Sequence, residues 1–387
     1  MTKKIKICCI TGTRADYPRV KSVLHKINNN QRFELQIIVT GSHLLESHGN
    51  SFKEIINDGF KIDKKVPMYT ESFNTPYGMA TATSRCMTGI ASALDELKPD
   101  ICLITVDRVE TLAAASAASL MNFPIAHIQG GEVTGTIDES IRHAVTKLSH
   151  IHFPATQDAF DRILYMGEPR ERIFLTGCPY IDIINEIEPT SKEILTQKYS
   201  INFAKPIVIF TQHPVTTEFG KSKEQIGITV KAIEKFSNDI NVVNFYSNPD
   251  AGGDEITEYL NATGFLNIPN MDSKDFLSLM HYAVLMIGNS SAGIREAPSF
   301  KLPAINIGSR QNGRLRGQNV IDVPHDLEEI EQAIRFALYD KVFLEKMEDL
   351  ENPYGDGNAA KRIVDVIERT EINQDLIKKV FIDNHGI

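Results

Sequence analysis

The feature that most restricts the fold is a series of short runs that are apolar at nearly every position and are separated by helix-length segments. The runs occupy residues 5–11, 34–40, 101–106, 125–128 and 173–177, and then 207–213, 241–247, 284–291, 304–308 and 319–323. Strands without polar alternation are typical of parallel sheets whose two faces are covered by helices. The sequence therefore predicts an α/β protein with two doubly wound sheets.

The chain of 387 residues is long enough for two domains, because single hydrophobic cores usually stop growing near about 250–300 residues. Residues 185–206 lack a long apolar run and contain two prolines, which favours a domain connection here. We expect domains at 1–188 and 189–368, followed by a C-terminal tail or helix at 369–387. Doubly wound domains bind ligands at the carboxyl ends of their strands, so we expect the function in a central cleft.

Composition excludes several classes of function. The net charge of −9 is spread along the chain, so nucleic acid is not an expected partner. No apolar run approaches the roughly 18 residues of a membrane span, and Lys6 interrupts the first apolar run, so we expect a cytoplasmic protein without a membrane partner. The five cysteines contain no C-x-x-C pair, which argues against a disulfide framework or a zinc site.

Residues 127–150, "HIQGGEVTGTIDESIRHAVTKLSH", read as a strand, a glycine turn and an amphipathic helix. Glu132 follows two glycines at a strand end, where a tight turn can present its carboxylate. Asp138 lies in the first helical turn, which favours its charged form; the alternative is a purely structural acid. Glu139 fits a capping box with Thr136. His143 and His150 are seven residues apart, too far for a metal-binding i, i+4 pair.

Other strand ends of the first half carry charged residues. Arg14 lies in "GTRAD", directly after the first strand, where a glycine loop and an arginine can bind an anion. Asp107 and Arg108 follow the strand at 101–106. These two residues either serve the site or simply pair with each other.

The second half offers a histidine and a set of anion-binding groups. His213 lies between a strand and a proline, where an imidazole can exchange protons or play a structural role. Ser290 and Ser291 follow a strand in "GNSSAGIREA" and present hydroxyl and backbone N–H groups that suit a pyrophosphate. Glu296 suits a ribose diol, and Arg310 follows on a glycine-containing loop. The alternative for these charged residues is solvated surface.

Taken in order, "TRADY", "VDR", "GGEVTGTIDESIRHAVTKLSH", "QHPVTT", "NPDAGG", "IGNSSAGIREA", "SRQNGR" and "YGDGNA" resemble the UDP-N-acetylglucosamine 2-epimerase family, and most closely its hydrolysing branch in sialic-acid-type sugar synthesis. The resemblance spans roughly residues 5–368. It implies a GT-B-type fold of two Rossmann-like domains, a C-terminal helix that crosses back to the first domain, no cofactor or metal, and a homo-oligomer, a dimer or a tetramer.

The resemblance also implies roles for individual residues. The family's catalytic acids fall on Asp107 and Asp138, and its catalytic histidine falls on His213. The family's contacts with the nucleotide sugar fall on Arg14, Arg108, Asn248, Ser290, Ser291, Glu296 and Arg310.

Two positions depart from the family pattern. Val106 replaces the glycine that precedes the first acid, and Gln129 replaces a catalytic glutamate. An amide does not act as a general acid or base at neutral pH. We therefore expect Glu132 or Asp138 to carry the proton while Gln129 orients the substrate, unless a water takes that role or the substrate differs.

The preferred reading is elimination of UDP from UDP-N-acetylglucosamine to a 2-acetamidoglucal, followed by hydration to N-acetylmannosamine. The first alternative is the same reaction on a UDP- or GDP-linked 2,4-diacetamido-6-deoxy sugar. More distant alternatives are a GT-B-type glycosyltransferase and a nucleotide-sugar sensor without activity. The acids at Asp107 and Asp138 favour elimination over transfer, because a simple transferase has less need for them.

Overall fold

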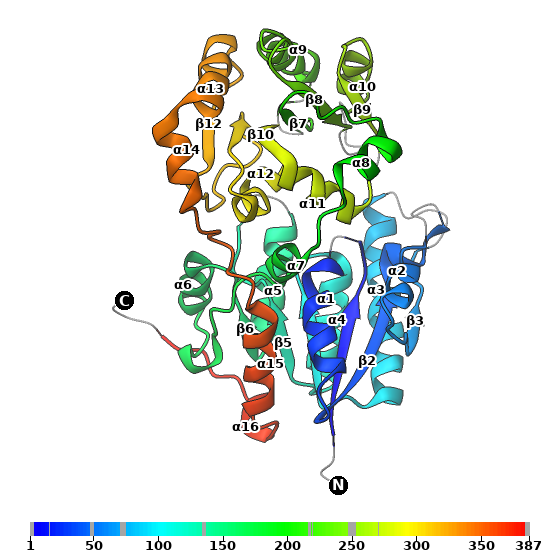
Figure 1. The fold of residues 1–387 in the computed structure, drawn as a ribbon. Coiled ribbons are helices and arrows are strands. Elements are labelled where there is room, and N and C mark those ends of the chain that lie inside the picture. Colours follow the sequence, from blue (N-terminus) through cyan, green and yellow to red (C-terminus); the bar gives the residue numbers. More distant parts are fainter. Residues whose placement is uncertain are drawn as a thin grey trace. The chain divides into compact units, whose positions relative to one another are not determined.

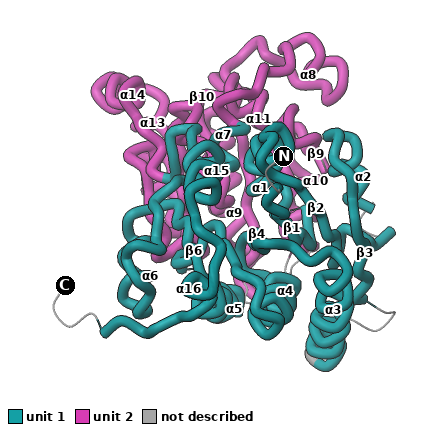
Figure 2. The backbone as a smooth tube through the Cα atoms, turned by 90° about the horizontal axis from the view of Figure 1, so that it is seen from below, with its two compact units in different colours: residues 1–183, 354–387 teal, residues 184–353 magenta. Residues whose placement is uncertain are grey.

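The computed structural model describes residues 4–14, 16–46, 50–69, 75–133, 137–215, 218, 220–246, 253–269 and 271–383. The chain forms two compact units (Figures 1 and 2): unit 1 comprises residues 1–183 and 354–387, and unit 2 comprises residues 184–353. Each unit contains one six-stranded sheet in its described part. The α/β class and the two doubly wound sheets predicted from the sequence are thereby confirmed.

The sheet of unit 1 has the order β3-β2-β1-β4-β5-β6, and its neighbouring strands are parallel. Its strands are β1 (Ile5–Thr11), β2 (Phe33–Thr40), β3 (Lys64–Val66), β4 (Ile101–Thr105), β5 (Ile125–Ile128) and β6 (Ile151–Phe153). Its α-helices are α1 (Pro18–Asn28), α2 (Phe52–Asn57), α3 (Pro76–Leu97), α4 (Val109–Leu120), α5 (Ile137–Leu148), α6 (Gln157–Tyr165), α7 (Pro179–Glu186), α15 (Ala359–Arg369) and α16 (Gln374–Ile377), and α7 continues into unit 2.

Alternation along the strands divides the core of unit 1 between the two faces of the sheet. Ile7 and Cys9 of β1 pack with α1 and α15, whereas Cys8 and Ile10 pack with α3, α4 and α5. Both faces are therefore covered, which explains why the strand carries no polar alternation.

The sheet of unit 2 has the order β12-β11-β10-β7-β8-β9 and is also parallel. Its strands are β7 (Ile207–Thr211), β8 (Asn241–Phe245), β9 (Leu266–Ile268), β10 (Ala283–Gly288), β11 (Ala304–Ile307) and β12 (Val320–Val323). Its α-helices are α8 (Lys192–Tyr199), α9 (Ser222–Glu234), α10 (Gly253–Asn261), α11 (Ser273–Tyr282), α12 (Ala292–Arg295), α13 (Leu327–Tyr339) and α14 (Lys341–Glu348). Short 3-10 helices occupy Gly41–Leu44, Arg170–Arg172 and Ala297–Phe300.

The structure corrects one predicted strand. Residues 173–177 do not form a strand: Ile173 makes a single bridge with His152, after the 3-10 turn at Arg170–Arg172. The apolar character of this run instead serves packing, since Ile173 is buried against Phe160 and Ile163.

The predicted C-terminal boundary is also corrected. We expected residues 354–368 in the second domain, but they belong to unit 1. The physical reason is α15, whose apolar residues Ile363, Val366 and Ile367 are buried in the same core as α1. In addition, Asp182 accepts hydrogen bonds from the N–H groups of Ala359 (3.0 Å) and Ala360 (2.7 Å), which fixes the start of α15.

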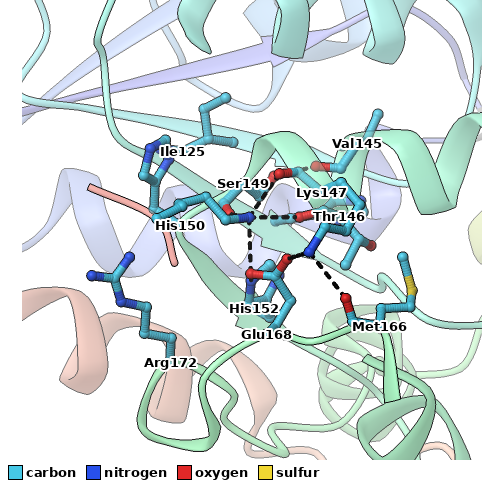
Figure 3. Close-up of polar contacts among 12 residues, drawn as sticks. Ile125, Val145, Thr146, Lys147, Ser149, His150, His152, Met166, Glu168 and Arg172 are labelled. Atoms are coloured by element: carbon cyan, nitrogen blue, oxygen red, sulfur yellow. Dashed lines mark hydrogen bonds and ion pairs between the residues drawn. The ribbon is translucent and has the colours of Figure 1, made fainter. Parts of the chain in front are cut away.

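The residues after α15 also pack on unit 1. The Lys379 ammonium donates to the carbonyls of Lys147 (2.7 Å) and Ser149 (2.5 Å) at the end of α5 and pairs with the buried Glu168 carboxylate at 2.8 Å. Glu168 also contacts His152 (3.0 Å) and Lys147 (2.6 Å), as seen in Figure 3. The tail therefore packs against the carboxyl end of α5, the helix whose first turn contains Asp138.

Candidate active site

Two residues in left-handed backbone conformation end adjacent strands of unit 1. Val106 follows β4 with φ +61°, and Gln129 follows β5 with φ +61°. Each still donates its N–H across the sheet, Val106 to Ile128 (3.2 Å) and Gln129 to Phe153 (2.9 Å). A β-branched residue is strained in this region, whereas glycine is not. The backbone at position 106 therefore has the conformation that suits the glycine of the family pattern, although this chain has valine there.

Arg142 of α5 joins the two loops that follow these strand ends. Its guanidinium is buried, with 3% of the side chain exposed, and pairs with the Asp107 carboxylate while also donating to the Glu132 carbonyl at 2.6 Å. A buried arginine pairs well with a carboxylate because its fork of donors matches two acceptors. Arg142 therefore holds Asp107 and the backbone of Glu132 together. The sequence reading missed this residue, although its place one turn after Asp138 was a usable signal.

The side chain of Gln129 lies among three polar groups. Its Oε1 accepts from Arg19 Nη1 at 3.3 Å, and its Nε2 donates to Cys178 Sγ at 3.1 Å and to Glu132 Oε1 at 3.5 Å. Gln129 is buried, with 2% exposed. The Gln129 amide thus lies beside the Glu132 carboxylate, which a second carboxylate at this position would repel.

A second charged group at the same sheet edge contains Arg108 and Asp138. Although burial alone would lower the pKa of Arg108, the charges of Glu110 and Asp138 raise it. Arg108 Nε lies 3.7 Å from the buried Glu110 carboxylate, which also accepts from Tyr69 at 2.8 Å. Arg108 therefore does not pair with its neighbour Asp107, as one reading of the sequence had allowed, and sits within the electrostatic reach of Asp138.

Arg14 is exposed on the loop after β1. The buried Asp16 carboxylate shapes this loop by accepting from the N–H groups of Gly12 (2.9 Å) and Thr13 (2.7 Å). Burial, and to a smaller extent the charge of Arg14, lower the pKa of His43 to about 4. Since β1, β4 and β5 are adjacent and parallel, the loops that carry Arg14, Asp107 and Gln129 leave the same edge of the sheet.

In unit 2, Asn289 organises the candidate residues. Its side chain accepts from the His213 N–H at 2.7 Å and donates to the His213 carbonyl at 2.8 Å, and its own carbonyl accepts from Arg310 Nη1 at 3.1 Å. Burial and the nearby Arg310 charge lower the pKa of His213 to about 4. The imidazole is therefore neutral at pH 7. The sequence reading missed Asn289, which sits between the glycine and serines that it did select.

The strand end before Asn289 requires glycine. Gly288 has φ +127°, and a Cβ here would lie 1.9 Å from the Thr211 carbonyl oxygen. This close approach brings the ends of β10 and β7 together, and with them Asn289 and His213. The serines that follow open α12, a single turn at Ala292–Arg295.

The other selected residues of unit 2 lie around this turn. Ser290 Oγ accepts from the Ala292 N–H at 3.3 Å, and Ser291 is the N-cap of α12. Glu296 directly follows α12 as its C-cap. Asn248, and Thr136 of the proposed capping box, lie outside the described residues.

The described residues contain no group of three or more His, Cys, Asp or Glu side chains that could hold a metal ion. Within that same part of the chain, no helix is both long and apolar enough to cross a membrane. His150 is buried and its Nδ1 accepts from the Ile125 N–H at 3.1 Å, so it has a structural role.

The chain thus contains two parallel α/β sheets, with acids at strand ends of unit 1 and a histidine, two serines and an arginine at strand ends of unit 2. The family model described as UDP-N-acetylglucosamine 2-epimerase matches residues 25–368. The chain belongs to this family.

Named relatives are similar over nearly their full length. The UDP-N,N'-diacetylbacillosamine 2-epimerase (hydrolyzing) of Legionella pneumophila is 35% identical, over 97% of this chain and 98% of the relative. A UDP-N-acetylglucosamine 2-epimerase of Neisseria meningitidis is 34% identical, over 98% and 99%. The crystal structure of a UDP-GlcNAc 2-epimerase from Neisseria meningitidis bound to UDP-GlcNAc has a similar fold, with a TM-score of 0.82 at 21% identity over 95% of this chain and 100% of that one.

Proposed function

We propose that this protein is a hydrolysing 2-epimerase of a UDP-linked 2-acetamido sugar, with UDP-N-acetylglucosamine as the first candidate substrate. The observation that carries the proposal is the set of acids at the strand ends of unit 1, where Asp107, Glu132 and Asp138 lie around Arg142 and Arg108. Transfer of a sugar to an acceptor has less need for such a set.

The proposed reaction has two steps. In the first, a base removes the C2 proton of the sugar, the C1–O bond breaks, and UDP leaves with the bonding electron pair to give a 2-acetamidoglucal. In the second, a proton adds to C2 from the opposite face and the hydroxyl of water adds to C1. The products are UDP and the free 2-epimer, so the overall reaction consumes one water.

The residues of unit 1 suit the proton transfers. Glu132 Oε1 lies 3.5 Å from the Gln129 Nε2 amide, and Asp107 is held by its ion pair with Arg142. Asp138 lies in the first turn of α5, and its charge acts on the nearby Arg108. We assign proton transfer to Glu132 and Asp138. Asp107 is fixed by Arg142 and is assigned to hydrogen bonds with the sugar hydroxyls.

Other residues suit the nucleotide. Ser290, Ser291 and Arg310 follow adjacent strands of unit 2 and supply hydroxyl, N–H and guanidinium donors for the diphosphate. His213 is neutral at pH 7 and can donate a hydrogen bond to a phosphate oxygen or accept a proton. Arg14, Arg108, Glu296 and Asn248 remain assigned to substrate binding on the family pattern.

A second candidate substrate is the UDP-linked 2,4-diacetamido-6-deoxy sugar, because one relative that matches almost the whole chain carries the name of an N,N'-diacetylbacillosamine enzyme. The two sugars differ at C4 and C6, so incubation of the same protein preparation with each of them shows which one is the substrate. We expect UDP release from one of them without any added acceptor, together with its free 2-epimer. UDP release that depends on an added acceptor would instead identify a glycosyltransferase.

A further inference from the structure

Unit 1 contains a hollow that includes none of the candidate active-site residues. It measures about 490 Å³ and lies between the segment 170–176 and α15, with Phe160 of α6 at its side. This volume falls within the range of roughly 300–1,000 Å³ that is usual for small-ligand sites. An inference about this hollow is therefore independent of the reaction proposed above.

The lining combines an apolar wall with cations. Phe160, Ile173, Phe174, Leu175 and Val366 supply the apolar surface. Leu175 is 45% exposed although it is a large aliphatic residue. Arg170, Arg362 and Arg369 supply the positive charge, opposed by one acidic residue in the lining, Asp365.

Two of these arginines carry uncompensated charge. Arg362 is neutralised by a two-pronged pair with Asp356 at 2.8 and 2.6 Å, and Asp365 is itself paired with Lys361 at 2.9 Å. In contrast, neither Arg170 nor Arg369 makes an ion pair with a carboxylate of the described residues.

Both of these guanidinium groups are already oriented. Arg170 lies over the Phe160 ring, with its Cζ 4.9 Å from the ring centre. Arg369 donates its Nε to the Asp365 carbonyl at 2.9 Å, a contact that does not use its two terminal nitrogens. Cations held in place beside an apolar wall bind an anion with little further loss of side-chain freedom.

We propose that this hollow binds a small organic anion, with a phosphate, sulfonate or carboxylate group at Arg170 and Arg369 and an apolar body against Phe174, Leu175 and Val366. A purely inorganic anion would leave the apolar wall uncovered, and a neutral apolar molecule would leave the two charges unpaired. The combination therefore selects a molecule that carries both parts.

The test is a fluorescence titration of the full chain with 8-anilino-1-naphthalenesulfonate, an aromatic sulfonate whose emission rises in apolar surroundings. The double variant Arg170→Gln/Arg369→Gln should bind this probe about tenfold more weakly or worse, because two charge-assisted contacts are lost. Leu175→Glu, at an exposed position, should weaken binding as well. The matched control is Arg32→Gln/Arg335→Gln, which makes the same change of net charge at exposed arginines outside the hollow and should bind like the unmodified protein.

Saturating UDP should leave the titration of the unmodified protein unchanged, because no residue assigned to the nucleotide lines the hollow. Equal probe affinity in the double variant and its control, or displacement of the probe by UDP, would overturn the proposal. UDP release from a sugar nucleotide is measured separately on the same samples, so failure of the proposed reaction would be recognised independently.

Discussion

The presence of Gln129 determines which acids of the candidate site we assign to proton transfer. Its amide replaces a carboxylate of the family pattern and lies 3.5 Å from the Glu132 carboxylate. Glu132→Gln and Asp138→Asn should each lower the rate of UDP release by roughly 10²–10⁴-fold, the usual contribution of a general acid or base. Gln129→Ala should lower this rate less than about tenfold. Glu371→Gln, at an exposed position outside the candidate site, serves as the control. An inactive Gln129→Ala beside two nearly normal carboxylate variants would refute the assignment.

Val106 is the second departure from the family pattern, and its left-handed backbone conformation leads to a prediction about stability. The left-handed conformation costs an L-residue about 1–2 kcal/mol that glycine does not incur. Both Val106→Gly and Val39→Gly should lower the free energy of unfolding. The loss should be smaller for Val106→Gly, by at least about 1 kcal/mol, because Val39 is a buried valine of the extended strand β2 and its replacement relieves no strain. Urea unfolding of both variants measures the difference. Equal losses would show that position 106 is unstrained.

At the scale of elements, α5 is fixed at both ends. Arg142 holds its first half to the loops that carry Asp107 and Glu132, and Lys379 caps its carboxyl end while pairing with the buried Glu168. Burial alone would raise the pKa of Glu168, but hydrogen bonds from His152, Lys147 and Lys379 lower it to about 2. Glu168 is therefore a buried charge that depends on its partners.

Lys379→Met should lower the free energy of unfolding by about 3 kcal/mol, since removal of one partner leaves a buried charge less compensated. Lys378→Met changes the neighbouring exposed lysine and should cost less than about 0.5 kcal/mol. Urea denaturation followed by circular dichroism compares the two variants. Matching stabilities would mean that Lys379 contributes nothing to the packing of the tail.

Elements with a strong local pattern were predictable from the sequence, and those fixed by distant contacts were not. The five-residue β4 is apolar at four of its five positions, whereas β3, β6 and β9 have only three residues each and no periodicity to detect. The pair Arg19–Gln129 joins residues 110 positions apart. The helix α15 belongs to unit 1 because its apolar face is buried in the same core as α1 and because Asp182 binds its first N–H groups. Such contacts depend on the folded topology rather than on local sequence.

At the scale of the whole molecule, buried histidines make the fold sensitive to acid. Burial lowers the pKa of His127 to about 3 and that of His43 and His150 to about 4, whereas an unfolded histidine titrates near about 6.5. The unfolded chain therefore binds more protons between these values. The stabilisation is complete above about pH 6.5 and is lost as the pH falls towards 4.

The free energy of unfolding should accordingly be lower at pH 5 than at pH 7.5. His127→Gln should reduce this difference, and His281→Gln, at an exposed position, should leave it unchanged. Urea titrations at the two pH values provide the measurement. Equal stability at pH 5 and 7.5 would show that these imidazoles are not buried in the neutral form.

The central claim concerns the reaction, and proton NMR in D2O tests it most directly. The protein is incubated with UDP-N-acetylglucosamine, and in parallel with its 2,4-diacetamido-6-deoxy counterpart, without an acceptor. Elimination followed by hydration predicts that UDP appears together with a free 2-epimer that carries deuterium at C2, because the new C2 hydrogen comes from solvent. A released sugar that retains its original C2 proton would contradict the account, whichever of the two substrates is used.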